Sequence, residues 1–439
     1  MIKHQKFLSL CSIVCMLLCA LVPTRVHAEQ TADFIDYVSQ LGFNRGSETV
    51  KAAVTVKTYV DGDTVHFYVD EQISESGVLK ARFLALNTPE STGKIEEYGK
   101  KAAAFTREKL ESAESIWVES DDGKWNFDST GDRRLVWVWY RLPGETTYRN
   151  LNLEILQNGL AIANSTSNNR YGTICDKALS QARAAKLNVH SGQKDPDFYY
   201  GDAVELTLKE LRTNLDAYNG IKVAFNGVVT MNSNNSVYVE SYDEETGLWY
   251  GMSVYYGFGL SGTGMNILSV GNEVRIVGTV QYYEAGGTWQ VSGLTYRMMK
   301  PNDPGNIQKL SEGHSPAWVL TDADTFVSQV TIQGEDTALT FDYAALAQAT
   351  SIEMQNLTVT DVYTTADEDS SSRGALTLTC QSGDQTVYVR TVPLYGTDGQ
   401  LVTADMFTGK TINVKGIVGC YDGQYQVMVF TLNSISFNE

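Results

Sequence analysis

The alternation of hydrophobic and polar residues changes character along the chain. Residues 52–195 combine β-branched, alternating segments with segments whose apolar positions recur every three or four residues. Strands that come first, with helices inserted and appended, indicate an α+β domain rather than a parallel doubly wound sheet. From residue 196 onward nearly every segment is strand-like, which predicts all-β structure. The expected strands of the α+β part are Val54–Val60, Thr64–Val69, Val78–Leu86, Ser115–Glu119 and Leu135–Leu142, and the expected helices are Glu97–Ala113, Leu151–Asn158 and Thr173–Ala185.

An internal repeat organises the all-β part. Segment 271–291 has two glycines seven residues apart, a strand–hairpin–strand pattern and a closing aromatic-Gln-Val, and segment 409–427 repeats all three features. Each copy is typical of the end of a small five-stranded barrel of the OB type. A cluster of proline and glycine between the copies predicts a linker. The expected domains are an α+β domain at 51–195, a first acidic barrel at 196–300, a linker at 301–316 and a second acidic barrel at 317–439.

The N-terminus has the features of a secretory signal peptide. Lys3 and Lys6 precede an apolar run of about 16 residues, shorter than the roughly 20 that a spanning helix needs, and a small-x-small sequence ends at Ala28. We therefore expect residues 1–28 to be cleaved and the protein to be secreted, with no membrane span after them. Residues 29–50 are expected to form an N-terminal arm, with Phe34, Val38 and Leu41 spaced as in a short amphipathic helix.

The charge is unevenly distributed. The 439 residues include 34 basic and 52 acidic side chains, a net charge of −18, which by itself argues against a nucleic-acid partner. Residues 51–195, however, carry 19 basic and 20 acidic side chains, whereas residues 196–439 carry 11 and 28. The acidity therefore belongs mainly to the all-β part, and a negatively charged substrate is not excluded for the first domain.

The cysteines left after cleavage suggest no metal site. Cys380 and Cys420 lie in strand-like runs of one domain and could pair in an oxidising compartment, while Cys175 lies on a helix pattern as a small buried hydrophobe. The sequence has no Cys-x-x-Cys or paired-histidine spacing, which makes a zinc site or a histidine-centred nuclease site unexpected.

Three short segments of the first domain place carboxylates and arginines where strands end. Asp61-Gly-Asp63-Thr lies between two strands, and its simplest interpretation is a hairpin turn. In segment 82–90, Arg82 interrupts an apolar strand, and the strand stops at a proline just before Glu90. In segment 128–135, an acidic turn leads into a strand that begins with Arg133 and Arg134. Arginine suits phosphate oxygens because its planar guanidinium stays charged, and carboxylates suit a hard cation.

Together, in this order and spacing, these segments resemble the staphylococcal nuclease family over about Lys51 to Gly192. The resemblance implies an OB-type barrel with three helices that hydrolyses phosphodiester bonds with Ca²⁺. It assigns Arg82, Glu90 and Arg133 to catalysis: the arginines bind the phosphate, and the glutamate is the residue proposed to activate water. It assigns metal binding to Asp63, Asn87 and the backbone carbonyl of Thr88, with Asp61 beside the ion.

Two departures from the family pattern bear on activity. Asn87 stands where the family usually has a second calcium-binding aspartate, so the site lacks one negative charge. Thr130, Ser165 and Ser167 stand where the staphylococcal enzyme has tyrosines that contact the nucleotide, and base stacking contributes roughly 1–3 kcal/mol per base. The catalytic residues are all retained, which favours an active enzyme.

The expected function is a secreted, calcium-dependent nuclease acting on DNA, with RNA left open as a second substrate. Water would attack in line, and the products would be 3′-phosphates if the chain follows the family. The acidic barrels would dock or space the catalytic domain, because a stacking platform for single strands needs a positive groove, and their aromatic residues suit barrel cores and cross-strand pairs. The alternative is a non-catalytic extracellular binding or adhesion protein built of three barrels.

Overall fold

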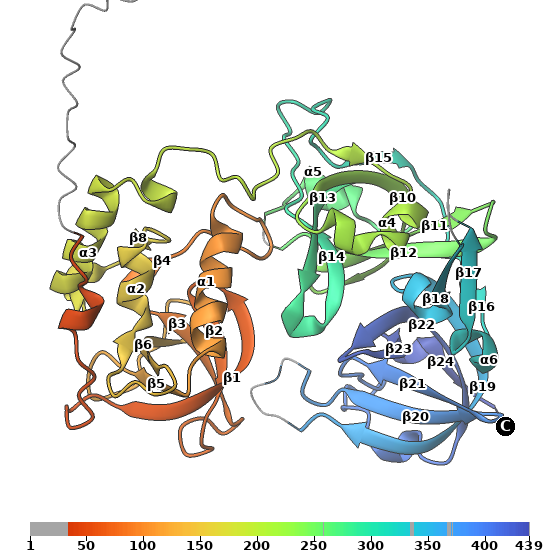
Figure 1. Ribbon diagram of the computed structural model, residues 1–439. Helices are drawn as coiled ribbons and strands as arrows, with labels where there is room; N and C mark the ends of the chain where they lie inside the picture. Colours follow the sequence, from red (N-terminus) through yellow and green to blue (C-terminus); the bar gives the residue numbers. More distant parts are fainter. Residues whose placement is uncertain (1–33, 258, 334–337, 367–369, 371, 439) are drawn as a thin grey trace, which may run out of the picture. The chain divides into compact units, whose positions relative to one another are not determined.

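The computed structural model describes residues 34–438 except 258, 334–337, 367–369 and 371 (Figure 1). The expected signal peptide lies outside these residues. From Asp36 onward the chain forms one compact unit. No helix in the described residues is both long and apolar enough to cross a membrane.

The first domain is a closed five-stranded barrel with the order β1-β2-β3-β6-β5. β3 and β6 pair in parallel, and β1 and β5 pair antiparallel, so the sheet has no open edge within the barrel. Its strands are β1 (Lys51–Asp61), β2 (Thr64–Tyr68), β3 (Val78–Phe83), β4 (Leu86–Asn87), β5 (Ser115–Glu119), β6 (Arg134–Arg141), β7 (Arg149–Asn150) and β8 (Ile162–Ala163), and its helices are α1 (Gly99–Glu111), α2 (Leu151–Gln157) and α3 (Gly172–Ala184).

The expected elements of this domain are confirmed, with small shifts at their ends. The strand 115–119 has the expected bounds, and all three helices begin and end within about two residues of the expected positions. The largest difference is that the strand expected over 78–86 splits into β3 and β4. Ala85 has a left-handed φ of 70° between them, a conformation that interrupts an extended strand.

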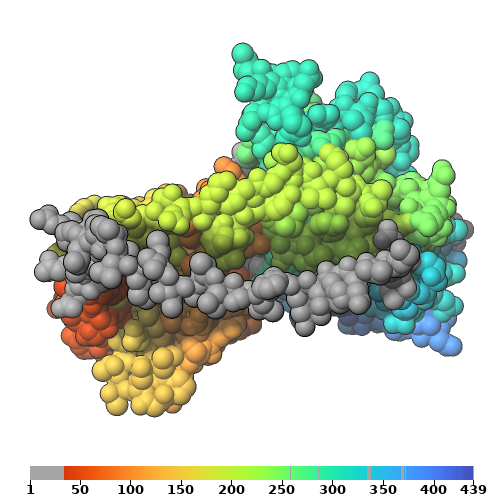
Figure 2. Space-filling view, turned by 45° about the horizontal axis from the view of Figure 1, so that its top comes forward, coloured from red at the N-terminus to blue at the C-terminus, as the bar shows by residue number. Residues whose placement is uncertain are grey.

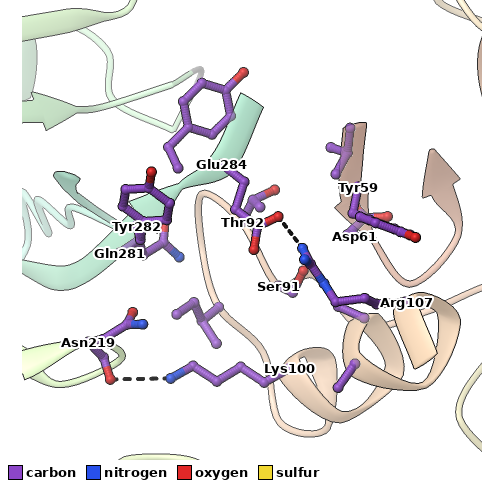
Figure 3. Close-up of a pocket in the computed structure, with 15 residues that line it drawn as sticks. Tyr59, Asp61, Ser91, Thr92, Lys100, Arg107, Asn219, Gln281, Tyr282 and Glu284 are labelled. Atoms are coloured by element: carbon purple, nitrogen blue, oxygen red, sulfur yellow. Dashed lines mark hydrogen bonds and ion pairs between the residues drawn. The ribbon is translucent and has the colours of Figure 1, made fainter. Parts of the chain in front are cut away.

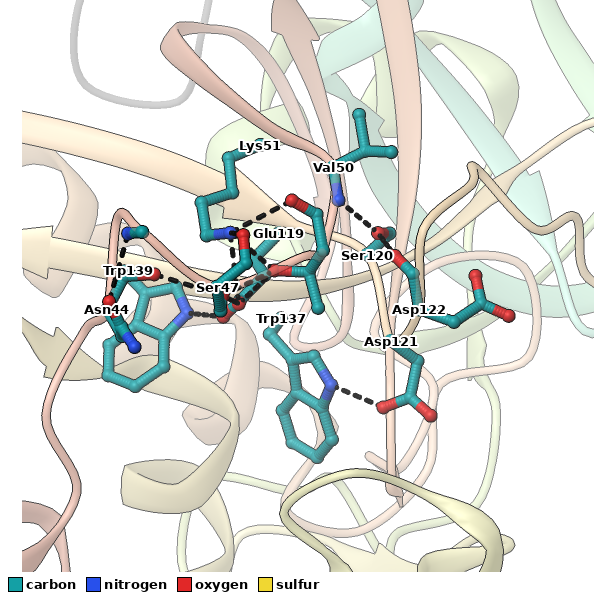
Figure 4. A network of polar contacts seen from close by, with 12 residues as sticks. Asn44, Ser47, Val50, Lys51, Glu119, Ser120, Asp121, Asp122, Trp137 and Trp139 are labelled. Atoms are coloured by element: carbon teal, nitrogen blue, oxygen red, sulfur yellow. Dashed lines mark hydrogen bonds and ion pairs between the residues drawn. The ribbon is translucent and has the colours of Figure 1, made fainter.

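Residues 34–50, the described part of the N-terminal arm, contain no α-helix and lie against the first barrel. They have only a 3₁₀ turn, η1 (Val38–Gln40), which buries Val38 in the core of the first barrel and leaves Phe34 52% exposed. The following residues are tied to the barrel through Glu119, whose buried carboxylate accepts hydrogen bonds from Thr49 Oγ1 at 2.6 Å and Trp139 Nε1 at 2.8 Å (Figure 4). The Lys51 ammonium lies 3.8 Å from the same carboxylate.

The rest of the chain forms two further barrels with the same strand order as the first. The second runs β10-β11-β12-β14-β13 and closes through β10 and β13, and the third runs β19-β20-β21-β23-β22 and closes through β19 and β22. This confirms α+β structure followed by all-β structure and the internal repeat. Their barrel strands are β10 (Lys222–Ser233), β11 (Ser236–Asp243), β12 (Leu248–Tyr255), β13 (Glu273–Tyr283) and β14 (Thr288–Ser292), then β19 (Ser351–Thr364), β20 (Leu376–Ser382), β21 (Gln385–Thr391), β22 (Thr411–Tyr421) and β23 (Gln424–Val429).

Short elements precede and connect these barrels. The expected linker 301–316 is in part a strand, because β15 pairs with β13 of the second barrel. The hairpin of β17 and β18, together with α7, contributes Ile332 and Leu346 to the core of the second barrel. These elements are β9 (Val204–Glu205), α4 (Leu208–Thr213), α5 (Thr263–Ile267), β15 (Gln308–Ser311), β16 (Val319–Leu320), α6 (Ala323–Phe326), β17 (Gln329–Gln333), β18 (Ala338–Asp342), α7 (Tyr343–Leu346) and β24 (Ile435–Phe437).

The connection between the first and second barrels is anchored at its start. Asp195 is 3% exposed and accepts a hydrogen bond of 2.6 Å from the backbone N–H of Tyr98, at the N-terminus of α1. Figure 2 shows the connection, in yellow-green, running along the surface from the first barrel toward the second. The segment therefore starts from a fixed point next to the helix that follows Glu90.

The cysteines and aromatic residues of the all-β part have structural positions. Cys380 and Cys420 do not pair: both thiols are free, and β19 lies between their strands, β20 and β22. Cys175 is buried on α3, as expected, and burial raises the pKa of its thiol to about 12. Tyr250 is fully buried, and the other aromatic residues include the cross-strand ring pairs Tyr242–Trp249 and Tyr282–Trp289.

Candidate active site

The turn between β1 and β2 places two buried carboxylates at one end of the first barrel. Asp61 and Asp63 are 6% and 1% exposed, and the backbone N–H of Asp63 donates to Asp61 Oδ1 at 3.1 Å. The turn is fastened to α1, because Thr106 Oγ1 donates to the Gly62 carbonyl at 2.6 Å. A Cβ at Gly62 would lie 2.9 Å from side-chain atoms of Thr88, so this close approach requires glycine. The predicted hairpin turn is therefore present, and it is packed against α1 and Thr88.

Arg82 reaches this turn from β3, where it pairs with Thr64 in the strand register. Its Nη1 lies 2.5 Å from Asp63 Oδ1, and its Nη2 donates to Asn87 Oδ1. The backbone N–H of Thr88 donates to the second oxygen of Asp63 at 2.9 Å. Strand pairing and these bonds thus bring together four of the expected site residues.

Glu90 lies at the end of the same segment. Its backbone N–H donates to Glu96 Oε2 at 3.2 Å, and its carbonyl accepts from the Glu96 N–H at 2.9 Å, which folds the loop back before α1. A Cβ at Gly99 would lie 2.1 Å from the Glu90 carbonyl oxygen, so α1 approaches Glu90 through a glycine. The Glu90 side chain is exposed and faces toward Asp61, whose charge acts on it.

Burial and a neighbouring carboxylate raise the pKa values of two acidic side chains in this cluster. Partial desolvation and then the charge of Asp61 raise the pKa of Asp63 to about 7, although Arg82 acts in the opposite direction. Partial desolvation and then the charge of Asp61 likewise raise the pKa of Glu90 to about 7, again against the effect of Arg82. Carboxylates that repel one another in this way favour a proton or a cation between them.

The donor set fits a hard divalent cation in its chemistry. Asp61, Asp63, Asn87 and the Thr88 carbonyl offer only oxygen, which calcium prefers, and Thr88 Oγ1 is buried without a hydrogen-bond partner. No group of three or more His, Cys, Asp or Glu side chains with metal-binding geometry occurs in the described part of the chain. In this structure Arg82 supplies a positive charge beside these ligands and contacts one oxygen of Asp63 and the oxygen of Asn87.

Arg133 is engaged elsewhere. Its Nε and Nη2 contact Asp128 Oδ2 at 2.8 and 2.7 Å, within the acidic turn that precedes β6. β6 pairs with β3 so that Arg82 lies opposite Leu135, which places Arg133 at the start of the neighbouring strand. Thr130 also bonds to Asp128. Arg82 therefore contacts the carboxylate cluster, whereas Arg133 is paired with Asp128 outside it.

A cavity of about 280 Å³ adjoins the cluster and has a wall from the second barrel (Figure 3). Asp61, Ser91 and Lys100 line it from the first barrel, while Tyr282 and Glu284 line it from β13 and the turn after it. The sequence gives no local signal for this wall, because its residues lie almost 200 positions away. Further contacts close the junction: Lys100 Nζ donates to the Asn219 carbonyl at 3.3 Å, and Arg107 pairs with Glu284.

The loop between Glu90 and α1 is held by the second barrel. The Gly93 N–H donates to Gln281 Oε1 at 3.1 Å, and Ser292 Oγ contacts both the Gly93 carbonyl and Gln281 Oε1. Gln281 and Ser292 are buried, at 4% and 0% exposure. These interlocking bonds fix the chain three residues after Glu90.

Residues 80–191 match the family model described as staphylococcal nuclease homologue. The first barrel thus carries a staphylococcal nuclease domain, with additional β-barrel-like domains after it. The match includes Arg82, Asn87, Glu90 and Arg133, whereas the turn that holds Asp63 lies before its first residue. A domain of this kind supports a nuclease or hydrolase family in general and implies binding of nucleic acid by this part of the chain.

Proposed function

We propose that this chain is an exported, calcium-dependent endonuclease that hydrolyses phosphodiester bonds of DNA, with RNA as a second substrate. The observation that carries the proposal is the cluster of Asp61, Asp63, Arg82 and Glu90 at one end of a staphylococcal nuclease domain. A phosphodiester repels a nucleophile, so a catalyst has to neutralise the phosphate and direct a water molecule in line. A guanidinium beside a carboxylate of raised pKa supplies both functions.

Each residue has a defined part in the proposed reaction. Arg82 and Arg133 bind phosphoryl oxygens and stabilise the charge that develops on them. Glu90 accepts a proton from the attacking water, and a pKa of about 7 suits a general base near neutral pH. The 5′-oxygen then leaves, which gives a 3′-phosphate product as in the family. Asp63, Asn87 and the Thr88 carbonyl would hold calcium, which would supply a positive charge to polarise a phosphoryl oxygen when bound.

The proposed dependence on calcium is consistent with the proposed export of the protein. Asn87 removes a negative charge from the ligand set, so the affinity for calcium is expected to be low. Calcium sites in extracellular modules work with dissociation constants of about 10⁻⁴–10⁻³ M. The signal-peptide features of residues 1–28 support a location outside the cell, where such a weak site fills.

The acidic barrels are proposed to dock or space the catalytic domain rather than to bind the substrate. Residues 196–439 have 11 basic and 28 acidic side chains. Several of their aromatic rings are buried or paired with one another across strands. Both observations oppose a surface that follows a phosphate backbone.

The test is cleavage of DNA by the purified chain, with calcium or a chelator, beside Glu90→Gln and Asp63→Asn. We expect the wild type to cleave only with calcium, and each variant to lose about 10²–10³-fold in rate, as when one preorganised group is removed from other enzymes. Glu108→Gln, on the exposed face of α1, is the matched control and should keep full activity. Equal cleavage by wild type and both variants would refute the site. A wild type that binds but never cleaves DNA across millimolar calcium would support the alternative, a non-catalytic binding protein.

A further inference from the structure

A second cavity lies where the second and third barrels meet. Its volume is about 100 Å³, and none of its lining residues belongs to the first barrel. Gly251 of β12 permits the close contact, because a Cβ there would lie 2.5 Å from the backbone of Ala349. The residues that line the cavity are Arg212, Tyr238, Ser253, Thr288 and Trp289 from the second barrel, and Gln348, Ala349, Val418, Gly419, Cys420 and Met428 from the third.

Arg212 is a buried cation without a buried anion. The residue is 7% exposed, and its Nη2 donates to the Ala345 carbonyl and to Gln348 Oε1, which are both uncharged. Its Nε is buried and has no hydrogen-bond partner. No carboxylate pairs with it among the described residues, and burial lowers the pKa of Arg212 to about 10. A buried charge of this kind is costly unless something pairs with it.

The other polar groups around the cavity are rich in hydrogen-bond donors. Thr288 Oγ1 accepts from Gln348 Nε2 at 2.8 Å, so its own O–H remains available to donate. No hydrogen bond is found for the side-chain hydroxyls of Ser253 and Tyr238 within the described part of the chain. The lining has no Asp or Glu, and its remaining surface includes the apolar side chains of Val418 and Met428. Such a lining suits a ligand with an anionic, oxygen-bearing end and an apolar end.

The size and charge of the cavity narrow the ligand class. One water molecule needs about 10–15 Å³ of such space, so the cavity has room for roughly seven to ten water-sized groups, which limits it to a small molecule. A single guanidinium balances a single negative charge, which disfavours a dianion such as phosphate. We propose that this cavity binds a short-chain monocarboxylate, with its carboxylate on Arg212 and its alkyl group against Val418 and Met428.

A monocarboxylate bound in this cavity would contact both acidic barrels. Arg212 lies on α4 of the second barrel, while Val418 and Met428 belong to β22 and β23 of the third. A ligand that contacts both barrels binds only when they are docked, and it therefore stabilises the docked state by mass action. The site is separate from the proposed nuclease site and does not depend on it.

The first experiment measures the thermal unfolding of the purified chain in increasing sodium propionate, against sodium chloride at equal ionic strength. We expect a saturable rise of the melting temperature with propionate alone, a weaker rise with acetate and none with phosphate. Arg212→Met should abolish the response. The matched control is Arg390→Met: Arg390 is partly buried in the third barrel, bonds to Thr377 and Thr365 and lies outside the cavity, so this variant should retain the response.

The second experiment needs no variant. Cys420 lines the cavity and is partly exposed, whereas Cys175 and Cys380 are buried. The folded wild type is alkylated with iodoacetamide, and mass spectrometry of the peptide that carries Cys420 follows this thiol separately from the cysteines of residues 1–28. Propionate should slow this reaction severalfold. The proposal is overturned if propionate changes neither the melting temperature nor the alkylation of the wild type. It is also overturned if Arg212→Met responds like the wild type, or if phosphate acts and propionate does not.

Discussion

At the scale of single residues, the guanidinium of Arg82 connects the two segments that the proposed chemistry needs. It contacts Asp63 from the β1–β2 turn and Asn87 from the end of β4, and its side chain is only 12% exposed. Both contacts use the planar arrangement of its two terminal nitrogens. A lysine ammonium is a compact point charge on a flexible chain, so it cannot hold both acceptors at once.

Arg82→Lys should therefore lower the rate of DNA cleavage by about 10²-fold or more, since it removes a preorganised donor while keeping the charge. The measurement is kcat/KM at saturating calcium, with circular dichroism to show that the fold is intact. Arg141→Lys is the matched control, because Arg141 ends β6 and pairs with the exposed Glu114. A rate for Arg82→Lys close to that of Arg141→Lys would contradict the role of the planar guanidinium of Arg82.

Glu240 is a second residue whose environment has a measurable consequence. Its buried carboxylate accepts from the N–H groups of Ala317 and Ser351 at 2.8 and 2.7 Å, across the junction of the second and third barrels. Desolvation raises the pKa of Glu240 above its ordinary value. The folded state therefore binds this proton more tightly than the unfolded state does.

For an acid with a raised pKa, stability falls as the pH rises from the unfolded pKa to the folded pKa. The contribution of Glu240 should be most favourable near pH 4 and should decline above it. In Glu240→Gln this decline should be absent. The free energy of unfolding of the wild type, taken relative to that of the variant, should therefore decrease between pH 4 and pH 8. Denaturant unfolding at several pH values measures it, and a constant or opposite difference would contradict the assignment.

At the scale of elements, the loop from Glu90 to α1 belongs to two domains. The first barrel supplies its sequence, while Gln281 on β13 and Ser292 on β14 supply the hydrogen bonds that hold Gly93. The position of Glu90 thus depends on a barrel that begins more than a hundred residues later. This gives the second barrel a structural reason to accompany the staphylococcal nuclease domain.

Ser292→Ala should lower kcat by about five- to tenfold with little change in KM. One buried hydrogen bond is worth about 1 kcal/mol, and 1.4 kcal/mol corresponds to about tenfold in rate. Ser311→Ala, on β15 of the same barrel and bonded to Glu273, is the control and should keep full activity. If both variants cleave DNA at the wild-type rate, the second barrel does not position the loop.

At the scale of the whole molecule, the charge distribution separates the near-neutral first barrel from the acidic remainder. Long-range attraction for nucleic acid is therefore weak, and the proposed hold on the substrate is local. Lys100 and Arg107, the cations nearest the adjoining cavity, already contact the Asn219 carbonyl and Glu284. Arg82 and Arg133 also have partners, Asp63 and Asp128, and we expect phosphate to replace these contacts at the proposed site.

The affinity for DNA should accordingly depend only weakly on salt. Two phosphate contacts predict that log K falls with log salt concentration with a slope of about −2. Fluorescence anisotropy with a labelled oligonucleotide and the Glu90→Gln variant measures binding without cleavage. A slope steeper than about −4 would reveal further cationic contacts and would contradict the local mode of binding.

The sequence by itself determined the elements, the barrel class and the residues of the three motifs. Hydrophobic periodicity and turn residues report local structure, so the three helices, β5 and the repeated hairpins could be predicted from them. The association of Arg82 and Glu90 with Asp63 came from the resemblance of the three segments, in their order and spacing, to the staphylococcal nuclease family. Whether Cys380 and Cys420 pair could not be judged in this way, since pairing depends on which strands are neighbours.

Only the tertiary structure decided which groups meet across large separations in sequence. The pairing of Arg133 with Asp128, the hold of Gln281 and Ser292 on Gly93, and the cavity around Arg212 all depend on contacts that hydrophobic patterns do not encode. The physical reason is that a hydrophobic pattern specifies which face of an element is buried, but not which partner covers it. The sequence therefore pointed to a nuclease domain followed by two barrels, and the fold showed that the first of these barrels forms part of the environment of Glu90.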